Sequence, residues 1–173
     1  GGLQLHFQPK VALETGKIVG FEALVRWPHP RLGLLQPADF VPLAESTDVI
    51  NPLTWWVVEN ALIQLRRWHD QFPELTMAVN LSVKNLLDRQ CSQHLEEIIR
   101  RIGVDPRLVE FELTETAIMT DPETALPMLR RITSTGARLA IDDFGTGYSS
   151  LAYLQRFPLH GIKIDRSFVA DMA

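Results

Sequence analysis

The alternation of short apolar segments with helix-type segments is the feature that most constrains the fold of this chain. The apolar segments are typical of strands and are found at residues 76–81, 109–113, 138–141 and 161–164. Helix-type segments lie between them at residues 92–102, 122–135 and 149–156. This repetition predicts a mostly parallel sheet with helical crossovers, which forms either an open doubly wound sheet or a (β/α) barrel.

The N-terminal part of the chain follows a different pattern. Two strand-like segments at residues 3–9 and 18–26 flank residues 14–17 (ETGK), whose glycine and polar residues predict a hairpin turn. Asn51 followed by Pro52 is typical of the N-cap and first residue of a helix, and a long apolar-periodic segment follows. We therefore expect an N-terminal β-hairpin and a long helix before the repeats.

Polar residues near the strand ends decide between the two sheet types. These residues are Asn80, Glu112, Asp142, Asp143 and Lys163, and Glu22 lies on the earlier hairpin strand. An open sheet would spread them along an edge, where each would need its own partner, whereas a barrel brings its strand ends together in one pocket. We therefore favour an α/β fold of the TIM-like (β/α) barrel type, with the N-terminal hairpin added to it.

The length of the chain bears on how much of such a barrel is present. A complete barrel takes roughly 250 residues, and this chain has 173. The final predicted strand at residues 161–164 would leave an unpaired edge, which invites association. We expect residues 1–173 to be the N-terminal two thirds or more of one domain.

Asp142 and Asp143 are adjacent carboxylates between an apolar strand and a glycine-rich segment. Ionised neighbours repel each other, so the pair is costly unless hydrogen bonds or a bound metal compensate it. A surface turn is the alternative, since Asp and Gly are ordinary turn residues. On its own the pair does not decide between a cation site and a turn.

Composition excludes several classes of protein. The chain is 46% hydrophobic and 22% charged, as ordinary globular domains are, and it has no apolar stretch of the roughly 18 residues that a membrane helix needs. A net charge of −4 without a run of Lys or Arg argues against DNA or RNA polymers as partners. The lone Cys91 fits a reducing compartment, so we expect a cytoplasmic protein or the cytoplasmic part of a membrane-attached parent.

Six separated motifs together resemble the EAL-domain family of bacterial proteins, which bind or hydrolyse cyclic di-GMP. In chain order they are residues 5–9 (LHFQP), 22–27 (EALVRW), 79–82 (VNLS), 111–115 (FELTE), 142–151 (DDFGTGYSSL) and 163–165 (KID). The resemblance implies an EAL-type barrel that hydrolyses cyclic di-GMP to the linear dinucleotide pGpG in second-messenger signalling. The alternative is a catalytically inactive EAL domain that acts as a cyclic di-GMP receptor or regulatory module.

The resemblance also implies a set of metal ligands. The family holds one Mg²⁺ or Mn²⁺ ion with the residues that match Glu22, Asn80, Glu112 and Asp142, and a second with those that match Asp142 and Asp143. Carboxylate and amide oxygens suit both ions. The resemblance further implies catalytic roles for Glu22, Asp143 and Lys163, and a structural ion pair is the alternative for the lysine.

Other matched positions imply ligand contacts and support. Gln8, Leu24, Arg26 and Asp143 match residues that contact the dinucleotide, and Glu115 matches one that stabilises the glycine-rich loop. From the residues alone, Leu24 would be a core residue and Glu115 a solvent-facing one. The family is commonly homodimeric and fused to GGDEF or sensory domains, so we expect a homodimer and such domains in a longer parent.

One family feature is missing from the chain. Family phosphodiesterases have a further strand with a catalytic glutamate after the segment that matches residues 163–165, and no such strand occurs before Ala173. We expect that the protein continues beyond Ala173, and the alternative is a truncated, inactive domain.

Overall fold

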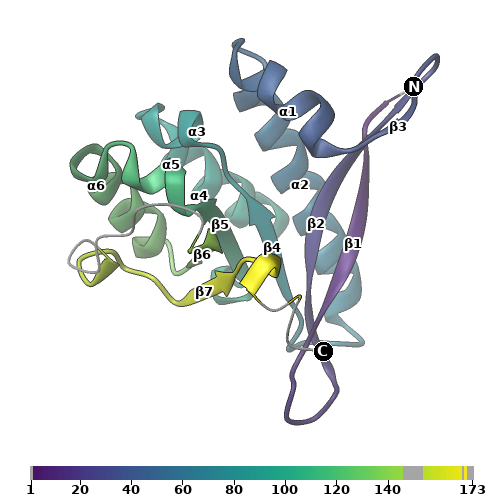
Figure 1. Cartoon of the computed structure of the whole chain (residues 1–173). Coiled ribbons are helices and arrows are strands. Elements are labelled where there is room, and N and C mark those ends of the chain that lie inside the picture. Colours follow the sequence, from purple (N-terminus) through teal and green to yellow (C-terminus); the bar gives the residue numbers. More distant parts are fainter. Residues whose placement is uncertain (1, 146–153, 169, 171–173) are drawn as a thin grey trace.

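The strands form one curved sheet in the computed structural model of this chain, which describes residues 2–145, 154–168 and 170 (Figure 1). They are β1 (Gln4–Val11), β2 (Ile18–His29), β3 (Gly33–Leu35), β4 (Thr76–Asn80), β5 (Val109–Thr114), β6 (Arg138–Phe144) and β7 (Gly161–Ile164). Their order is β1-β2-β4-β5-β6-β7, with β3 paired to β2. β1 and β2 form an antiparallel hairpin, and β2, β4, β5, β6 and β7 run parallel.

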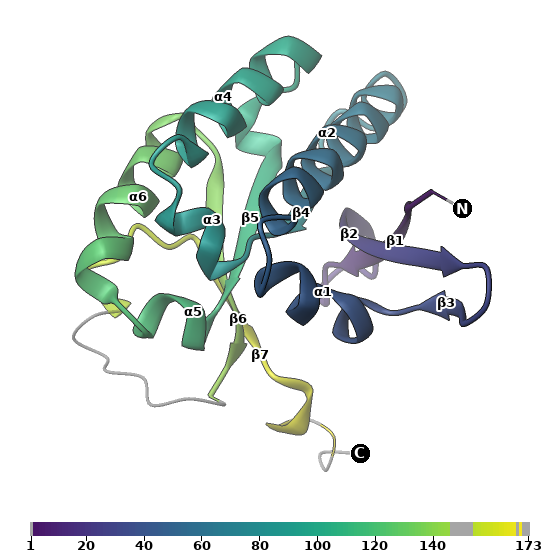
Figure 2. The same ribbon diagram turned by 90° about the horizontal axis from the view of Figure 1, so that it is seen from above.

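The helices follow the parallel strands as crossovers. They are α1 (Pro37–Glu45), α2 (Ile50–His69), α3 (Val83–Leu87), α4 (Cys91–Ile102), α5 (Glu115–Met119) and α6 (Pro122–Ser134), with short 3₁₀ turns η1 (Pro106–Leu108) and η2 (Arg166–Phe168). Figure 2 shows that α2, α4 and α6 lie on the same side of the parallel strands. Within the described residues, no helix combines the length and the apolar character needed to cross a membrane.

Alternation along the strands separates an apolar face from a polar one. In β5, Val109, Phe111 and Leu113 belong to the buried hydrophobic core. Glu110 and Glu112 lie between them in sequence, so their side chains point to the opposite, inner face of the sheet. The inner face therefore bears the charged residues, while the outer face packs the core.

The inner face is strongly curved. β2 and β4 lie between β1 and β5, so a flat sheet would place β1 and β5 roughly 14 Å apart. Nevertheless, Lys10 Nζ of β1 lies 2.5 Å from Glu110 Oε1 of β5. Lys10 is paired with Gly20 of β2, and Glu110 is paired with Ala78 of β4, so neither neighbour has a side chain long enough to block the contact. The sheet thus curls like the wall of a (β/α) barrel.

Most of the predicted elements are confirmed. The hairpin turns at Gly16, which has a φ of 66°. Asp121 caps α6 by accepting a hydrogen bond from the Thr124 N–H, and Gly136 follows the helix with a φ of 96°. The short elements β3, α3 and α5 were not predicted, because three to five residues are too few to show a period.

The start of α2 differs from the prediction. Asn51 is not an N-cap: α2 begins at Ile50, and the Asn51 amide instead bonds the side chains of Asn85 and Asp88. Tertiary hydrogen bonds have therefore displaced the local cap. Residues 149–153 of the helix expected at residues 149–156 lie outside the described residues.

Candidate metal centre

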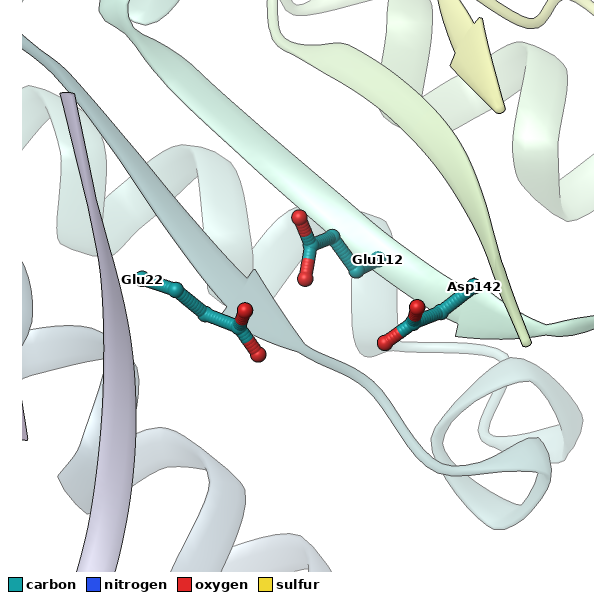
Figure 3. Close-up of side chains that lie close together, drawn as sticks. All are labelled: Glu22, Glu112 and Asp142. Atoms are coloured by element: carbon teal, nitrogen blue, oxygen red, sulfur yellow. The ribbon is translucent and has the colours of Figure 1, made fainter. Parts of the chain in front are cut away.

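Three carboxylates from three different strands meet on the inner face of the sheet. Glu22 lies on β2, Glu112 on β5 and Asp142 on β6, and one carboxylate oxygen from each lies within 4.8 Å of the other two. Figure 3 shows the three carboxylates pointing toward one another. The convergence predicted from the strand ends is thus confirmed for residues 120 positions apart in the sequence.

Lys163 of β7 contacts all three carboxylates. Its Nζ lies 3.0 Å from Glu22 Oε2, 2.6 Å from Glu112 Oε2 and 2.9 Å from Asp142 Oδ2. Burial alone would lower the pKa of Lys163, but the hydrogen bond to Glu112 and the surrounding negative charges raise it above its ordinary value. Three carboxylates and one ammonium leave a formal charge of −2, which one divalent cation would neutralise.

Glu112 forms the buried floor of the cluster. Its side chain is fully buried, and burial raises its pKa, as does the charge of Glu22, while Lys163 and Lys10 oppose this rise. Lys10 Nζ lies 3.3 Å from Glu112 Oε1, and Lys163 binds the other oxygen, Oε2. A buried carboxylate needs such partners to remain ionised.

Asn80 adds an amide to the cluster. It ends β4, and its Nδ2 donates a hydrogen bond of 2.8 Å to Glu22 Oε1. Asn80 is paired with Glu112 in the β4–β5 register, so both side chains lie on the inner face. The carboxylates and this amide are the oxygen-bearing groups that Mg²⁺ and Mn²⁺ prefer, so the donor set fits either ion.

The adjacent aspartates lie within β6 rather than after it. The strand extends to Phe144, beyond the predicted end at Ile141, so the surface-turn alternative for the pair is wrong. Asp143 has a φ of 53°, and its N–H donates to Asp142 Oδ1 over 2.9 Å. Asp143 is exposed beside the cluster, and partial loss of hydration around its carboxyl, together with the charges of Asp142 and Asp165, raises its pKa.

Glu115 links α5 to the glycine-rich segment. Its side chain is buried, and its Oε2 accepts a hydrogen bond of 2.7 Å from the Gly145 N–H. The solvent-facing alternative is therefore wrong. Gly145 has a φ of 98°, and a Cβ there would lie 2.7 Å from the Phe168 ring. The remainder of the glycine-rich motif, from residue 146, lies outside the described residues.

The remaining predicted residues surround the cluster. Gln8 of β1 is paired with Glu22, and Leu24 and Arg26 follow Glu22 on the same face of β2. Leu24 and Asn80 line a cavity of about 470 Å³ that lies between the middle of β2, the ends of β4 and β5, and the helices α1, α2 and α5. The Arg26 guanidinium bonds the carbonyl oxygen of Val25.

Lys10 is a residue of the centre that the sequence analysis missed. A signal was present, because Lys10 follows Gln8 by two residues on the same strand face. Its contact with Glu112 on a distant strand depends on the curl of the sheet, which strand patterning does not reveal.

Comparison with known proteins identifies the family. The sequence profile described as EAL domain matches residues 1–173. The chain belongs to the EAL domain family. This EAL domain is 40% identical to the cyclic di-GMP phosphodiesterase PA2567 of Pseudomonas aeruginosa. The match extends over 172 residues, which are 99% of this chain and 29% of PA2567. It is also 40% identical to the bifunctional diguanylate cyclase/cyclic di-GMP phosphodiesterase MucR of the same organism, over 99% of this chain and 25% of MucR.

A solved structure supports the fold. The structure titled PaMucR phosphodiesterase, c-di-GMP complex, matches with a TM-score of 0.94 at 40% identity, over 98% of this chain and 69% of that chain. The α/β fold of this EAL domain is therefore that of the TIM-like EAL barrels, of which a part is present. The chain spans less than a third of the length of these two curated relatives.

Proposed function

We propose that this EAL domain hydrolyses one phosphodiester bond of cyclic di-GMP and releases the linear dinucleotide pGpG. The observation that carries the proposal is the meeting of Glu22, Glu112 and Asp142 with Lys163, from four parallel strands, on the inner face of the sheet. Support comes from relatives such as PA2567, which is named a cyclic di-GMP phosphodiesterase, and from the structural neighbour solved in complex with that dinucleotide.

The proposed centre holds two Mg²⁺ or Mn²⁺ ions. Glu22, Asn80, Glu112 and Asp142 would bind the first ion, and Asp142 with Asp143 would bind the second. The formal charge of −2 on the three carboxylates and Lys163 supports at least one divalent ion, and the exposed Asp143 carboxylate beside Asp142 offers a further ligand. Such ions polarise a phosphate and lower the pKa of bound water.

The side chains then have distinct tasks in the hydrolysis. A water oxygen forms a bond to phosphorus and the water gives up a proton, while the bond from phosphorus to the 3′ oxygen breaks and the 3′ oxygen takes up a proton to leave as a hydroxyl. Asp143 and Glu22 orient the water by accepting its hydrogen bonds, and the Lys163 ammonium donates to the water or to a phosphate oxygen. Glu115 holds the backbone at Gly145, which fixes the segment that bears Asp143.

The dinucleotide would lie across the open side of the cluster. Gln8, Leu24, Arg26 and Asp143 are the proposed contacts, with the Arg26 guanidinium placed on a phosphate. The cavity of about 470 Å³ beside Leu24 is partly apolar and large enough for a purine base.

We also propose the setting in which the domain works. The 69% coverage of the PaMucR phosphodiesterase chain supports residues 1–173 as the N-terminal two thirds or more of one domain. The bifunctional name of MucR supports a parent with a GGDEF or sensory domain. A homodimer and a cytoplasmic location complete the proposal, and the single cysteine, Cys91, supports a reducing compartment.

A chromatographic time course with cyclic di-GMP tests the function. The protein is incubated with Mg²⁺ or with chelator, and the variant Glu22→Gln is run beside the matched surface control Glu14→Gln. We expect Mg²⁺-dependent formation of pGpG by the wild type and by Glu14→Gln, and a loss of roughly 100-fold or more for Glu22→Gln. Binding of cyclic di-GMP without turnover would favour the receptor alternative, and absence of both binding and turnover would overturn the proposal.

A further inference from the structure

Lys10 lies on the inner face of β1 and contacts two glutamates of β5. Its Nζ is 2.5 Å from Glu110 Oε1 and 3.3 Å from Glu112 Oε1. The partner of Lys10 in the β1–β2 register is Gly20, so no side chain on β2 blocks the path of the lysine. The short contact with Glu110 anchors the ammonium beneath Glu112.

The two oxygens of Glu112 are therefore divided between two lysines. Lys10 bonds Oε1 from beneath Glu112, and Lys163 bonds Oε2 on the side where Glu22 and Asp142 lie. A carboxylate held in this way presents one oxygen to the cluster and cannot rotate to present both. Partners of this kind, which orient a ligand without touching the metal, tune metal affinity strongly.

We infer that Lys10 is a positioning residue, which fixes Glu112 so that Oε2 alone faces the metal centre. The inference rests on the metal centre of the proposed function. Lys10 acts through Glu112 and does not touch the ion. Lys10 therefore has two opposing effects on the affinity for a divalent cation. Its positive charge repels the cation, whereas its hydrogen bond to Glu112 orients that ligand and favours binding.

The two effects change the Mn²⁺ dissociation constant in opposite directions, so calorimetric titration of the metal-free protein with Mn²⁺ at fixed ionic strength distinguishes them. Lys10→Met keeps the length of the side chain and removes the ammonium. Loss of positioning raises the Mn²⁺ dissociation constant by about tenfold or more, whereas loss of a repelling charge alone would lower it. Arg138→Gln is the matched control, because Arg138 is also an inner-face cation, 3.6 Å from Glu110, whereas the ion pairs of Glu112 within the described residues are with Lys10 and Lys163. We expect its dissociation constant to stay within about twofold of the wild-type value.

The possible titration results distinguish failure of the Lys10 positioning role from failure of the proposed metal centre. A dissociation constant for Lys10→Met that equals or falls below that of the wild type overturns the positioning role and leaves the metal centre intact. Absence of Mn²⁺ binding by the wild type overturns both. If Lys10→Met does not fold, Lys10→Arg decides, since it keeps the charge but moves the donors: weaker binding supports positioning, and unchanged binding overturns it.

Discussion

Lys163 Nζ lies 2.6 Å from Glu112 Oε2, although the lysine side chain is 30% exposed and the glutamate side chain is not exposed at all. The pair therefore joins the solvent side of the centre to its buried floor. Glu112 cannot reach water, so its charge depends on Lys163 and Lys10 whenever no metal is bound. The stability of the metal-free domain and its affinity for metal are linked through these contacts.

Replacing Lys163 by Met should make stability more dependent on metal. The three carboxylates lose the cation that they share, so we expect the melting temperature in chelator to fall by roughly 2–8 °C. Added Mg²⁺ should then raise the melting temperature of Lys163→Met more than that of the wild type, because the ion restores the missing charge. Thermal unfolding with and without Mg²⁺ measures both effects. Lys17→Met, at an exposed position, is the control, and equal melting temperatures for Lys163→Met and Lys17→Met in chelator would contradict the expectation.

Replacing Glu115 should affect turnover more than metal binding. Its carboxylate bonds the Gly145 N–H and does not belong to the metal cluster of the described residues. We expect Glu115→Ala to lower the rate of pGpG formation roughly 10- to 100-fold, with a smaller loss for Glu115→Gln, whose amide oxygen can still accept the hydrogen bond. Steady-state rates paired with Mn²⁺ titrations check this. Equal losses in both variants would exclude the hydrogen bond as the cause.

Two glycines on the inner face should respond very differently to alanine. A Cβ at Gly20 would lie 2.1 Å from Thr76 Oγ1 and 2.7 Å from the Thr76 carbonyl oxygen, so β2 and β4 would have to separate. Among the described residues, a Cβ at Gly161 would meet only the Ala140 Cβ, at an ordinary 3.6 Å. We expect Gly20→Ala to lower the free energy of unfolding by about 3 kcal/mol and Gly161→Ala by less than about 1 kcal/mol. Urea denaturation measures both, and similar values would argue against close packing at Gly20.

The thiol of Cys91 should be unreactive in the folded protein. Burial, with a smaller effect of the Asp88 charge, raises the pKa of Cys91 from 9.0 to about 12. The folded state therefore holds the thiol proton more tightly than the unfolded state does. This contribution to stability is complete below pH 9.0 and is lost as the pH rises toward 12, by up to about 1.4 kcal/mol per pH unit.

Two measurements check the behaviour of Cys91. Labelling with an aromatic disulfide reagent should be slow in buffer and fast in guanidinium chloride. The free energy of unfolding should fall less steeply above pH 9.0 in Cys91→Ala than in the wild type, because the variant lacks the titrating group. Rapid labelling of the folded protein would show that the thiol is accessible, and identical pH profiles would show that folding does not raise its pKa.

Much of the candidate centre could be predicted from the sequence, because the direction of a side chain along a strand is a local property. Alternation in β5 places Glu110 and Glu112 on the face opposite the apolar Phe111. Polar residues near the ends of successive parallel strands then had to meet if the sheet curled into a barrel. The meeting of Glu22, Glu112 and Asp142 follows from this reasoning.

Contacts that cross several strands could not be predicted in the same way. Lys10 reaches Glu112 only because the sheet curls and because Gly20 leaves the path open. Asn51 has the local sequence of a helix cap, yet it lies inside α2, and its side chain is hydrogen-bonded to the side chains of Asn85 and Asp88. The sequence by itself determined the presence of every strand except β3, the apolar faces of these strands and the residue types near their ends. The tertiary structure decided which side chains bond one another, since curl, strand register and burial depend on the packing of the whole chain at once.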